Sequence, residues 1–320
     1  MKVGVLPLSS HIADPAWLTE FAAAVERTPA ESVWMFEHVA LPSQYRSVYP
    51  FSPDGKMGGP TDADLPDPLQ WLQHLAALTD RVRLATGLMI LPLHHPLILA
   101  KRLATLDRLS RGRVIAGFGI GWLAEEYEAL GVPFTERGRR ADEALQVLRA
   151  AWAPGASEFA GRYHSFRDLH VNPKPVDPAG VPIVLGGGSR AAMRRAAHWG
   201  DGVFLLGQDL AHIGGLLQTL YEEADAIGRP REQFEITVDA PADRRAADRL
   251  RSWHVDRVVV AAPADDLDTW ERTVDRRCQE LLEGGRGPGA ARYCAGSPAV
   301  SPPSTTNSAP VANELSSEAR

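Results

Sequence analysis

The stretch Val181–Leu206, VPIVLGGGSRAAMRRAAHWGDGVFLL, reads as one complete strand–helix–strand unit. Val181–Leu185 is a short apolar run rich in β-branched residues, which favours a strand. Ser189–His198 has the spacing of a helix, and Gly202–Leu206 is a second apolar run. Strands joined by a helical crossover run parallel, so the stretch predicts part of a parallel sheet covered by helices.

The same alternation recurs along the chain in both directions from this unit. The other expected strands are Lys2–Leu8, Ser32–Phe36, Val82–Ile90, Val114–Phe118, Phe234–Val238 and Arg257–Ala261. The expected helices are Pro15–Arg27, Pro68–Leu78, Pro96–Leu109, Glu125–Leu130, Arg137–Trp152, Leu210–Ile227, Asp243–Trp253 and Asp266–Leu282. Eight such units predict an α/β fold, a TIM (β/α)8 barrel, over residues 1–283. An open doubly wound sheet is the alternative, but its G-x-G-x-x-G fingerprint is missing after the first strand.

Three further segments interrupt or follow this rhythm. The stretches 40–66 and 153–181 are too long for ordinary connections and are expected as loop insertions at the C-terminal face, the second containing a surface hairpin. Residues 284–320 contain hardly any large apolar side chain, so we expect a disordered C-terminal tail.

Composition and charge exclude several classes of function. The net charge of −6 argues against a nucleic-acid partner and favours a small-molecule ligand. No apolar run approaches the roughly 20 residues of a membrane helix, and the first residues lack the plan of a signal peptide, so a cytoplasmic protein without a membrane partner is expected. Two cysteines are too few for a disulfide framework or a four-ligand zinc site.

Glycines dominate the predicted carboxyl ends of the strands. Gly117, Gly119 and Gly121 follow the fourth strand, and the sequence LGGGSR, residues 185–190, follows the fifth. Such residues allow a flat cofactor to approach the backbone, and a glycine turn at a helix start can bind phosphate. The alternative is a turn that only packs helix against strand, and the pattern alone leaves both interpretations open.

Two histidine-containing pairs stand near strand ends. Glu37 and His38 follow the second strand and can form a proton-handling pair, because imidazole exchanges protons near neutral pH. A histidine packed at the barrel rim is the alternative. His94 and His95 have no further ligand at metal spacing, so we expect a structural role at the helix start and no metal site.

Several motifs together resemble the luciferase-like monooxygenase superfamily, especially its branch that depends on coenzyme F-420, a deazaflavin. They cover nearly all of residues 2–282 in the family's order, and they are SVWMFEHV (32–39), RVRLATGLMILPLHHP (81–96), ATLDRLSRGRVIAGFGIGW (104–122), EEYEALGVPFTERGRRADE (125–143), PIVLGGGSRAAMRRAAHWGDG (182–202) and VDRVVV (255–260).

The resemblance implies a bacterial luciferase-like barrel with the cofactor ring at the strand ends. His38 resembles the catalytic histidine near the ring, with Glu37 as its neighbour, and members often have a non-prolyl cis peptide in the strand-three bulge. Implied cofactor contacts are Thr86, Gly87 and Leu88 at that bulge, Gly119, Gly121 and Trp122 after strand four, and Gly186, Gly187, Gly188, Ser189 and Arg190 as the phosphate loop.

Two departures from the family pattern are visible. Trp122 stands where related deazaflavin dehydrogenases carry a catalytic acid, and residues 27–31 replace the usual E-x-x-G-[FY]-D, which is expected to disturb the lower rim of the barrel.

The function implied by the resemblance is an oxidoreductase that transfers a hydride between F-420 and a small organic substrate, with a homodimer expected. The alternatives are an FMN-dependent monooxygenase using molecular oxygen and a non-catalytic cofactor-binding barrel.

Overall fold

The structure, a computed structural model, describes residues 1–282. The predicted disordered tail, residues 284–320, lies outside the described residues, and the domain boundary at residue 283 stays a prediction.

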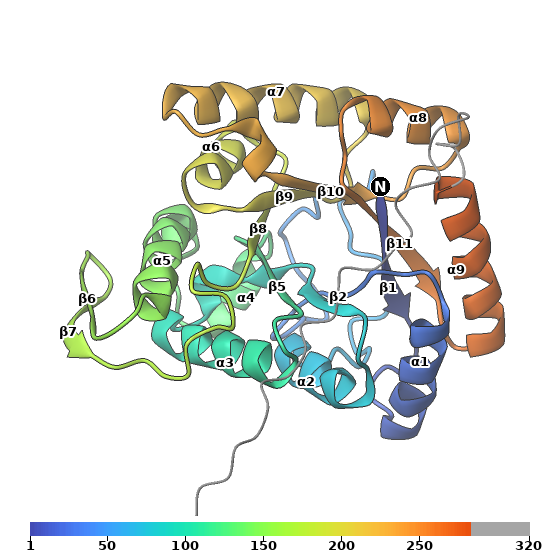
Figure 1. The fold of residues 1–320 in the computed structure, drawn as a ribbon, viewed down its shortest axis with the longest axis horizontal. Coiled ribbons are helices and arrows are strands. Elements are labelled where there is room, and N and C mark those ends of the chain that lie inside the picture. Colours follow the sequence, from blue (N-terminus) through green and yellow to red (C-terminus); the bar gives the residue numbers. More distant parts are fainter. Residues whose placement is uncertain (283–320) are drawn as a thin grey trace, which may run out of the picture. The chain divides into compact units, whose positions relative to one another are not determined.

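A closed ring of parallel strands forms the centre of the fold, and helices surround it (Figure 1). Its neighbours are hydrogen-bonded in the order β3-β2-β1-β11-β10-β9-β8-β5, and pairing of β3 with β5 closes the ring. The strands are β1 (Lys2–Leu8), β2 (Ser32–Met35), β3 (Arg83–Thr86), β4 (Met89–Ile90), β5 (Val114–Gly119), β8 (Ile183–Gly186), β9 (Gly202–Leu205), β10 (Glu235–Asp239) and β11 (Arg257–Pro263). The prediction of a TIM barrel is confirmed.

The helices begin close to the predicted residues because the sequence marks their starts. They are α1 (Pro15–Arg27), α2 (Pro68–Leu78), α3 (Pro96–Leu109), α4 (Ala124–Ala129), α5 (Arg137–Trp152), α6 (Arg190–Trp199), α7 (Leu210–Ala226), α8 (Arg244–Ser252) and α9 (Leu267–Leu282). Proline occupies the first turn of α1, α2 and α3, while Asp14 and Asp67 accept a backbone N–H at the starts of α1 and α2. The predicted hairpin is β6 (Ser157–Ala160) with β7 (Ser165–Leu169).

The third barrel strand is broken where the sequence predicted one continuous run. β3 and β4 are separated at Gly87–Leu88, whose peptide bond is cis, as the family resemblance implied. At the break, the Thr86 hydroxyl bonds the backbone of Gly117 on both sides, at 2.8 Å to its N–H and 2.8 Å to its carbonyl. A Cβ on Gly117 would lie 1.9 Å from the Thr86 carbonyl oxygen, so this glycine is required for the strands to approach.

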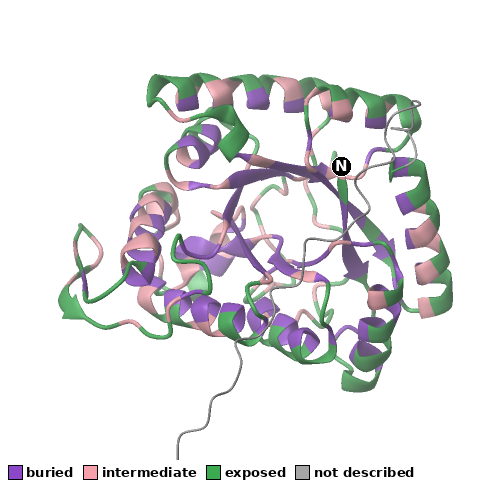
Figure 2. Ribbon diagram, viewed as in Figure 1, coloured by how far each residue is buried: buried purple, intermediate pink, exposed green. Residues whose placement is uncertain are grey.

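Apolar side chains fill the space both inside and outside the ring, and the buried residues follow the strands and the inner helix faces (Figure 2). The interior cluster consists of Leu6, Trp34, Ala85, Ile115, Val184, Phe204 and Val259. Trp34 and Phe204 meet edge to face at 4.9 Å. The interior is a packed core, so chemistry is confined to the ends of the barrel.

The N-terminal end of the barrel is closed by a buried ion cluster. The Arg257 guanidinium is fully buried, pairs with Glu31 at 2.8 Å, and also pairs with Glu235. It lies 5.7 Å from the Trp34 ring, at the floor of the interior core. Burial opposes ionisation of Glu235, but Arg257 and Lys2 outweigh it and lower its pKa to about 2.

The expected disturbance of the lower rim at residues 27–31 is wrong. The Arg81 guanidinium donates to the carbonyl oxygens of Val25, Thr28 and Ala30 at 2.5 to 3.0 Å. Thr28 and Ala30 are buried, and Glu31 belongs to the ion cluster. Arg81 therefore joins three carbonyl oxygens of this irregular turn and holds it in place.

None of the helices within residues 1–282 is both long enough and apolar enough to span a bilayer.

Candidate active site

The residues that follow the carboxyl ends of the parallel strands meet at one end of the barrel, here called the mouth. His38 comes after β2, Leu88 lies between β3 and β4, and Trp122 follows β5. Gly187 follows β8, and Gly207 follows β9. This is the end at which barrel enzymes place their chemistry.

His38 is held at the mouth by a carboxylate that the sequence analysis did not identify. Its Nδ1 lies 3.0 Å from Glu126 Oε2, and the two side chains are 7% and 1% exposed. The second oxygen of Glu126 accepts the backbone N–H of Val39 at 2.6 Å. A carboxylate can only accept here, so Nδ1 carries the proton and Nε2 has no hydrogen-bond partner among residues 1–282.

Glu37 and His38 do not form the predicted pair with each other. Glu37 instead accepts the N–H of Ile90 at 2.7 Å and lies 2.9 Å from His94 Nε2. Consecutive residues leaving a strand point in different directions, so Glu37 turns toward β4 while His38 turns toward α4. His94 thus has a partner far along the chain, whereas His95 stands at the start of α3 without capping it through its side chain.

Neighbouring carboxylates of α4 also fasten the 40–66 loop. Glu125 accepts the backbone N–H of Arg46 at 2.7 Å and the Ser47 hydroxyl at 2.7 Å. These hydrogen bonds, the Ser47 hydroxyl first, lower the pKa of Glu125 to about 2. The predicted active-site excursion is therefore tied to the same short helix that orients His38.

Aromatic side chains from this loop meet Trp122 and define what we call the aromatic arch: Tyr45, Tyr49, Phe51 and Trp122. Trp122 contacts Tyr49 at 5.1 Å and Tyr45 at 5.3 Å, in both cases edge to face. Tyr49 contacts Phe51 at 5.3 Å. Phe51 packs against Gly207, since a Cβ on this glycine would lie 2.4 Å from the Phe51 ring. Because Gly207 follows β9, the arch ends on the β9 side of the mouth.

The arch also touches His38. The imidazole and the Trp122 ring meet edge to face with centroids 5.8 Å apart. Two predicted site residues, His38 and Trp122, are thus brought together.

Leu88 covers the glycines that the sequence analysis interpreted as an open floor. A Cβ on Gly186 would lie 2.0 Å from a Leu88 methyl, and one on Gly119 would lie 3.6 Å from it. A ring placed here meets the Leu88 side chain and not bare backbone. The Thr86 side chain is fully buried and bonded to Gly117, so its hydroxyl is unavailable to a ligand. Gly121 adopts a φ of +67° to make the turn after β5.

The predicted phosphate loop leads from β8 into α6. Gly187 has a φ of +129°, and Ser189 caps the helix by accepting the Ala192 N–H at 3.2 Å. The backbone N–H groups of Gly188, Ser189 and Arg190 have no hydrogen-bond partner within the described part of the chain. Unpaired donors at the start of a ten-residue helix are suited to an anion.

The Arg190 side chain does not face this loop. It is 79% exposed and pairs with Glu223 of α7 at 3.3 Å. Gln208 and His212 are the side chains that reach the loop instead, since His212 Nε2 lies 3.1 Å from the Gly188 carbonyl oxygen. Both follow β9, and their position just after a strand was the only sequence signal for them.

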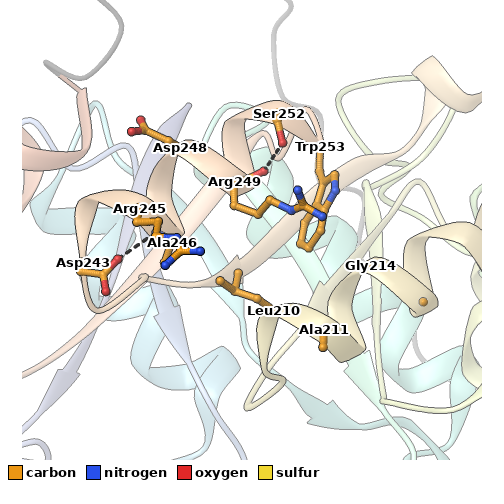
Figure 3. A pocket seen from close by; sticks show the side chains of 11 residues that line it. Leu210, Ala211, Gly214, Asp243, Arg245, Ala246, Asp248, Arg249, Ser252 and Trp253 are labelled. Carbon is orange, nitrogen blue, oxygen red and sulfur yellow. Dashed lines mark hydrogen bonds between the residues drawn. The ribbon is translucent and has the colours of Figure 1, made fainter.

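A separate cavity of about 870 Å³ lies outside the barrel between α7 and α8 (Figure 3). Its lining includes Gly214, Arg249 and Trp253, and Arg249 lies over the Trp253 ring at 4.9 Å. None of the predicted site residues lines it. Among residues 1–282, no group of three or more His, Cys, Asp or Glu side chains is arranged to hold a metal ion.

Comparison with known proteins gives one family match. The sequence profile described as luciferase-like monooxygenase matches residues 1–292. An F-420-dependent glucose-6-phosphate dehydrogenase of Kineococcus radiotolerans is 31% identical over 246 residues, which are 75% of this chain and 67% of the relative.

Two solved structures share the fold. The monooxygenase RslO1 of Streptomyces bottropensis superposes with a TM-score of 0.71 at 21% identity, covering 88% of this chain and 99% of the other. The oxygenating constituent of 3,6-diketocamphane monooxygenase of Pseudomonas putida, in complex with FMN, gives 0.68 at 15% identity, covering 88% and 98%.

Proposed function

Because the chain belongs to the luciferase-like monooxygenase family of flavin- and F-420-dependent oxidoreductases, we propose that it transfers a hydride between F-420 and a small organic substrate. The single observation that carries this proposal is the His38–Glu126 pair, which leaves His38 Nε2 at the mouth without a partner in the described part of the chain. The 31% identity to an F-420-dependent dehydrogenase supports the choice of cofactor. The homodimer and the cytoplasmic location stay predictions.

The residues at the mouth fit such a cofactor. The unpaired N–H groups of Gly188, Ser189 and Arg190 would hold its phosphate, and Gly187 leaves the backbone accessible. Leu88 would support one face of the ring, with His38 and Trp122 beside it. Bound F-420 would supply or accept the hydride.

His38 would handle the proton that accompanies the hydride. Glu126 fixes the Nδ1–H tautomer, so Nε2 accepts a proton from a substrate hydroxyl or, in the reverse direction, donates one to a substrate carbonyl oxygen. Burial of both side chains keeps water from competing for Nδ1.

An FMN-dependent monooxygenase that uses molecular oxygen is the second candidate. The observation that favours it is Trp122, which stands where the family resemblance places the catalytic acid of F-420 dehydrogenases. Apolar surroundings of this kind shelter oxygen chemistry from water.

Cofactor titration separates the two candidates. Purified protein is titrated with F-420 and with FMN while cofactor fluorescence is followed, and oxygen consumption is recorded with reduced FMN. We expect tight binding of F-420 only. Tight binding of FMN together with oxygen consumption would establish the second candidate instead.

Substitution of His38 tests the proposed proton transfer. His38→Gln should lower turnover of an accepted alcohol or ketone by about 10²- to 10⁴-fold, the usual contribution of general acid–base catalysis, with unchanged F-420 affinity. His198→Gln, on the exposed face of α6, is the control and should leave turnover unchanged. Unchanged turnover in His38→Gln would disprove this role.

A further inference from the structure

The aromatic arch crosses the mouth as a continuous apolar surface. It meets His38 through Trp122, which follows β5, and it reaches Gly207 after β9 through Tyr49 and Phe51. These strands occupy separate positions around the ring. A molecule that enters above the cofactor therefore meets ring edges and faces on one side.

The arch is fixed in place. Glu125 and Glu126 hold both the start of the loop and Ser47 through backbone and hydroxyl hydrogen bonds. Rigid aromatic walls of this kind select flat apolar ligands, because stacked or edge-to-face contacts add about 0.5–1.5 kcal/mol beyond area burial.

Three acidic groups at the mouth, Glu37, Glu126 and Asp239, have no Lys or Arg partner among residues 1–282. Glu126 pairs with His38, and Glu37 pairs with His94. Even with the histidine protonated, the net charge of each pair is zero and not positive. Asp239 at the end of β10 accepts the Gly207 N–H and no other within residues 1–282, and burial raises its pKa. This carboxylate lies beside the arch, because Gly207, whose N–H it accepts, packs against the Phe51 ring.

The Lys and Arg side chains of residues 39–66 and of the 185–190 loop each have contacts of their own. Lys56 donates to the Tyr45 carbonyl oxygen at 3.1 Å and lies over the Tyr45 ring at 4.3 Å. Arg46 is 95% exposed beside Glu125, and Arg190 pairs with Glu223. A substrate phosphate beside the arch would therefore lose water without gaining a cation from these segments.

We propose that this site takes a flat, uncharged, largely apolar substrate, such as an aromatic or polycyclic alcohol or ketone, and excludes sugar phosphates. The substrate class thus differs from the one named for the 31% identical relative. The reaction in this inference rests on the proposed function. The substrate class rests on the aromatic arch and on the charges at the mouth.

Matched probes test the substrate class by calorimetry at pH 7. They are 2-naphthol, which is flat and neutral, 2-naphthyl phosphate, which adds a charge to the same ring, and glucose 6-phosphate, which has the charge without the ring. Each is titrated into the free protein and into protein loaded with F-420. We expect 2-naphthol to bind at least tenfold more tightly than 2-naphthyl phosphate, and no heat with glucose 6-phosphate. Binding of glucose 6-phosphate, or equal binding of the two naphthyl probes, would overturn the proposal.

Variants connect that binding to the arch. Tyr49→Ala should weaken 2-naphthol about tenfold, while Tyr49→Phe keeps the ring and the affinity. Tyr221→Ala, on α7 beneath Arg231, is the matched control and should bind as the parent does. Unchanged affinity in Tyr49→Ala would show that the probe binds elsewhere and would also overturn the proposal.

Failure of the proposed F-420 reaction and failure of the proposed substrate class would give different experimental results. Absence of F-420 binding in the separate fluorescence titration rejects the F-420 reaction but leaves the 2-naphthol result on the free protein standing. Conversely, F-420 binding together with glucose 6-phosphate binding rejects only the substrate class.

Discussion

The two ends of the barrel use charged side chains in opposite ways. At the N-terminal end, Arg257 satisfies Glu31 and Glu235, and its guanidinium has no exposure to solvent. At the mouth, Glu126 holds one nitrogen of His38 and leaves the other without a partner among residues 1–282.

This difference separates stability from chemistry within one fold. A cluster whose members satisfy one another closes the barrel but can do nothing to a ligand. A pair with one unsatisfied atom can exchange a proton, and unpaired N–H groups beside it can receive an anion. The free atoms, and not the number of charges, distinguish the candidate active site.

The largest expected effect is on stability at the closed end. Arg257→Met leaves Glu31 without this cation and Glu235 with Lys2 alone, and should lower the free energy of unfolding by about 3 kcal/mol. Urea unfolding measures this. Arg27→Met, which removes an ion pair whose arginine is 57% exposed and well solvated, should lower the free energy of unfolding far less. Equal losses in the two variants would contradict the comparison.

At the mouth, loss of an ionised partner should affect turnover more than stability. Glu126→Gln keeps an acceptor for Val39 but no longer fixes the proton on His38 Nδ1. We expect turnover to fall about 10- to 100-fold, with a changed pH profile and little change in urea unfolding. A stability loss as large as that of Arg257→Met, with an unchanged pH profile, would make Glu126 a structural residue only.

A smaller effect is expected in the phosphate loop. Gly187→Ala puts a side chain at a φ of +129°, 2.9 Å from the Ala192 Cβ, and should weaken F-420 about tenfold by shifting the unpaired N–H groups. Gly228→Ala also has a positive φ but opens onto free space, so it controls for backbone strain. If both variants bind F-420 as the parent does, the phosphate assignment is wrong.

The smallest effect concerns the loop anchor. The pKa of Glu125 is lowered from 4.5 to about 2. The stabilisation that its carboxylate gives to the folded loop is therefore complete above pH 4.5 and is lost as the pH falls toward 2. At neutral pH, Glu125→Gln should speed tryptic cleavage after the exposed Arg46 a few-fold, followed by mass spectrometry. Glu128→Gln, on the exposed face of α4, is the control. Equal cleavage rates in the two variants would contradict an anchoring role.

Local sequence signals predicted most of the fold. α1, α2, α3 and α5 have the predicted bounds, and proline at the first position and aspartate caps explain several of these starts. β1 also has its predicted bounds. Periodicity did not predict the break between β3 and β4, because residues 84–90 contain a single polar side chain, Thr86, and nothing in their pattern marks the interruption.

Only the site residues that lie next to a strand end in the sequence could be predicted. His38 and the glycine loop follow strands, so the barrel places them at the mouth without further information. Glu126 is 88 residues from His38, and His94 is 57 residues from Glu37, so only the closed ring brings these partners together. The loop aromatics lack any periodicity, and their contacts with Trp122 depend on the anchors at Glu125 and Glu126.

The adjacency of Glu125 and Glu126 on one short helix links two events in a catalytic cycle. The carboxylate that secures the 40–66 loop neighbours the one that aligns the histidine, so release of the loop would be felt at both. Movement of α4 during loop opening would also misalign His38, so proton transfer would be disabled while the site is accessible to water. The helix would then act as an interlock, which permits the reaction only after the substrate has been enclosed.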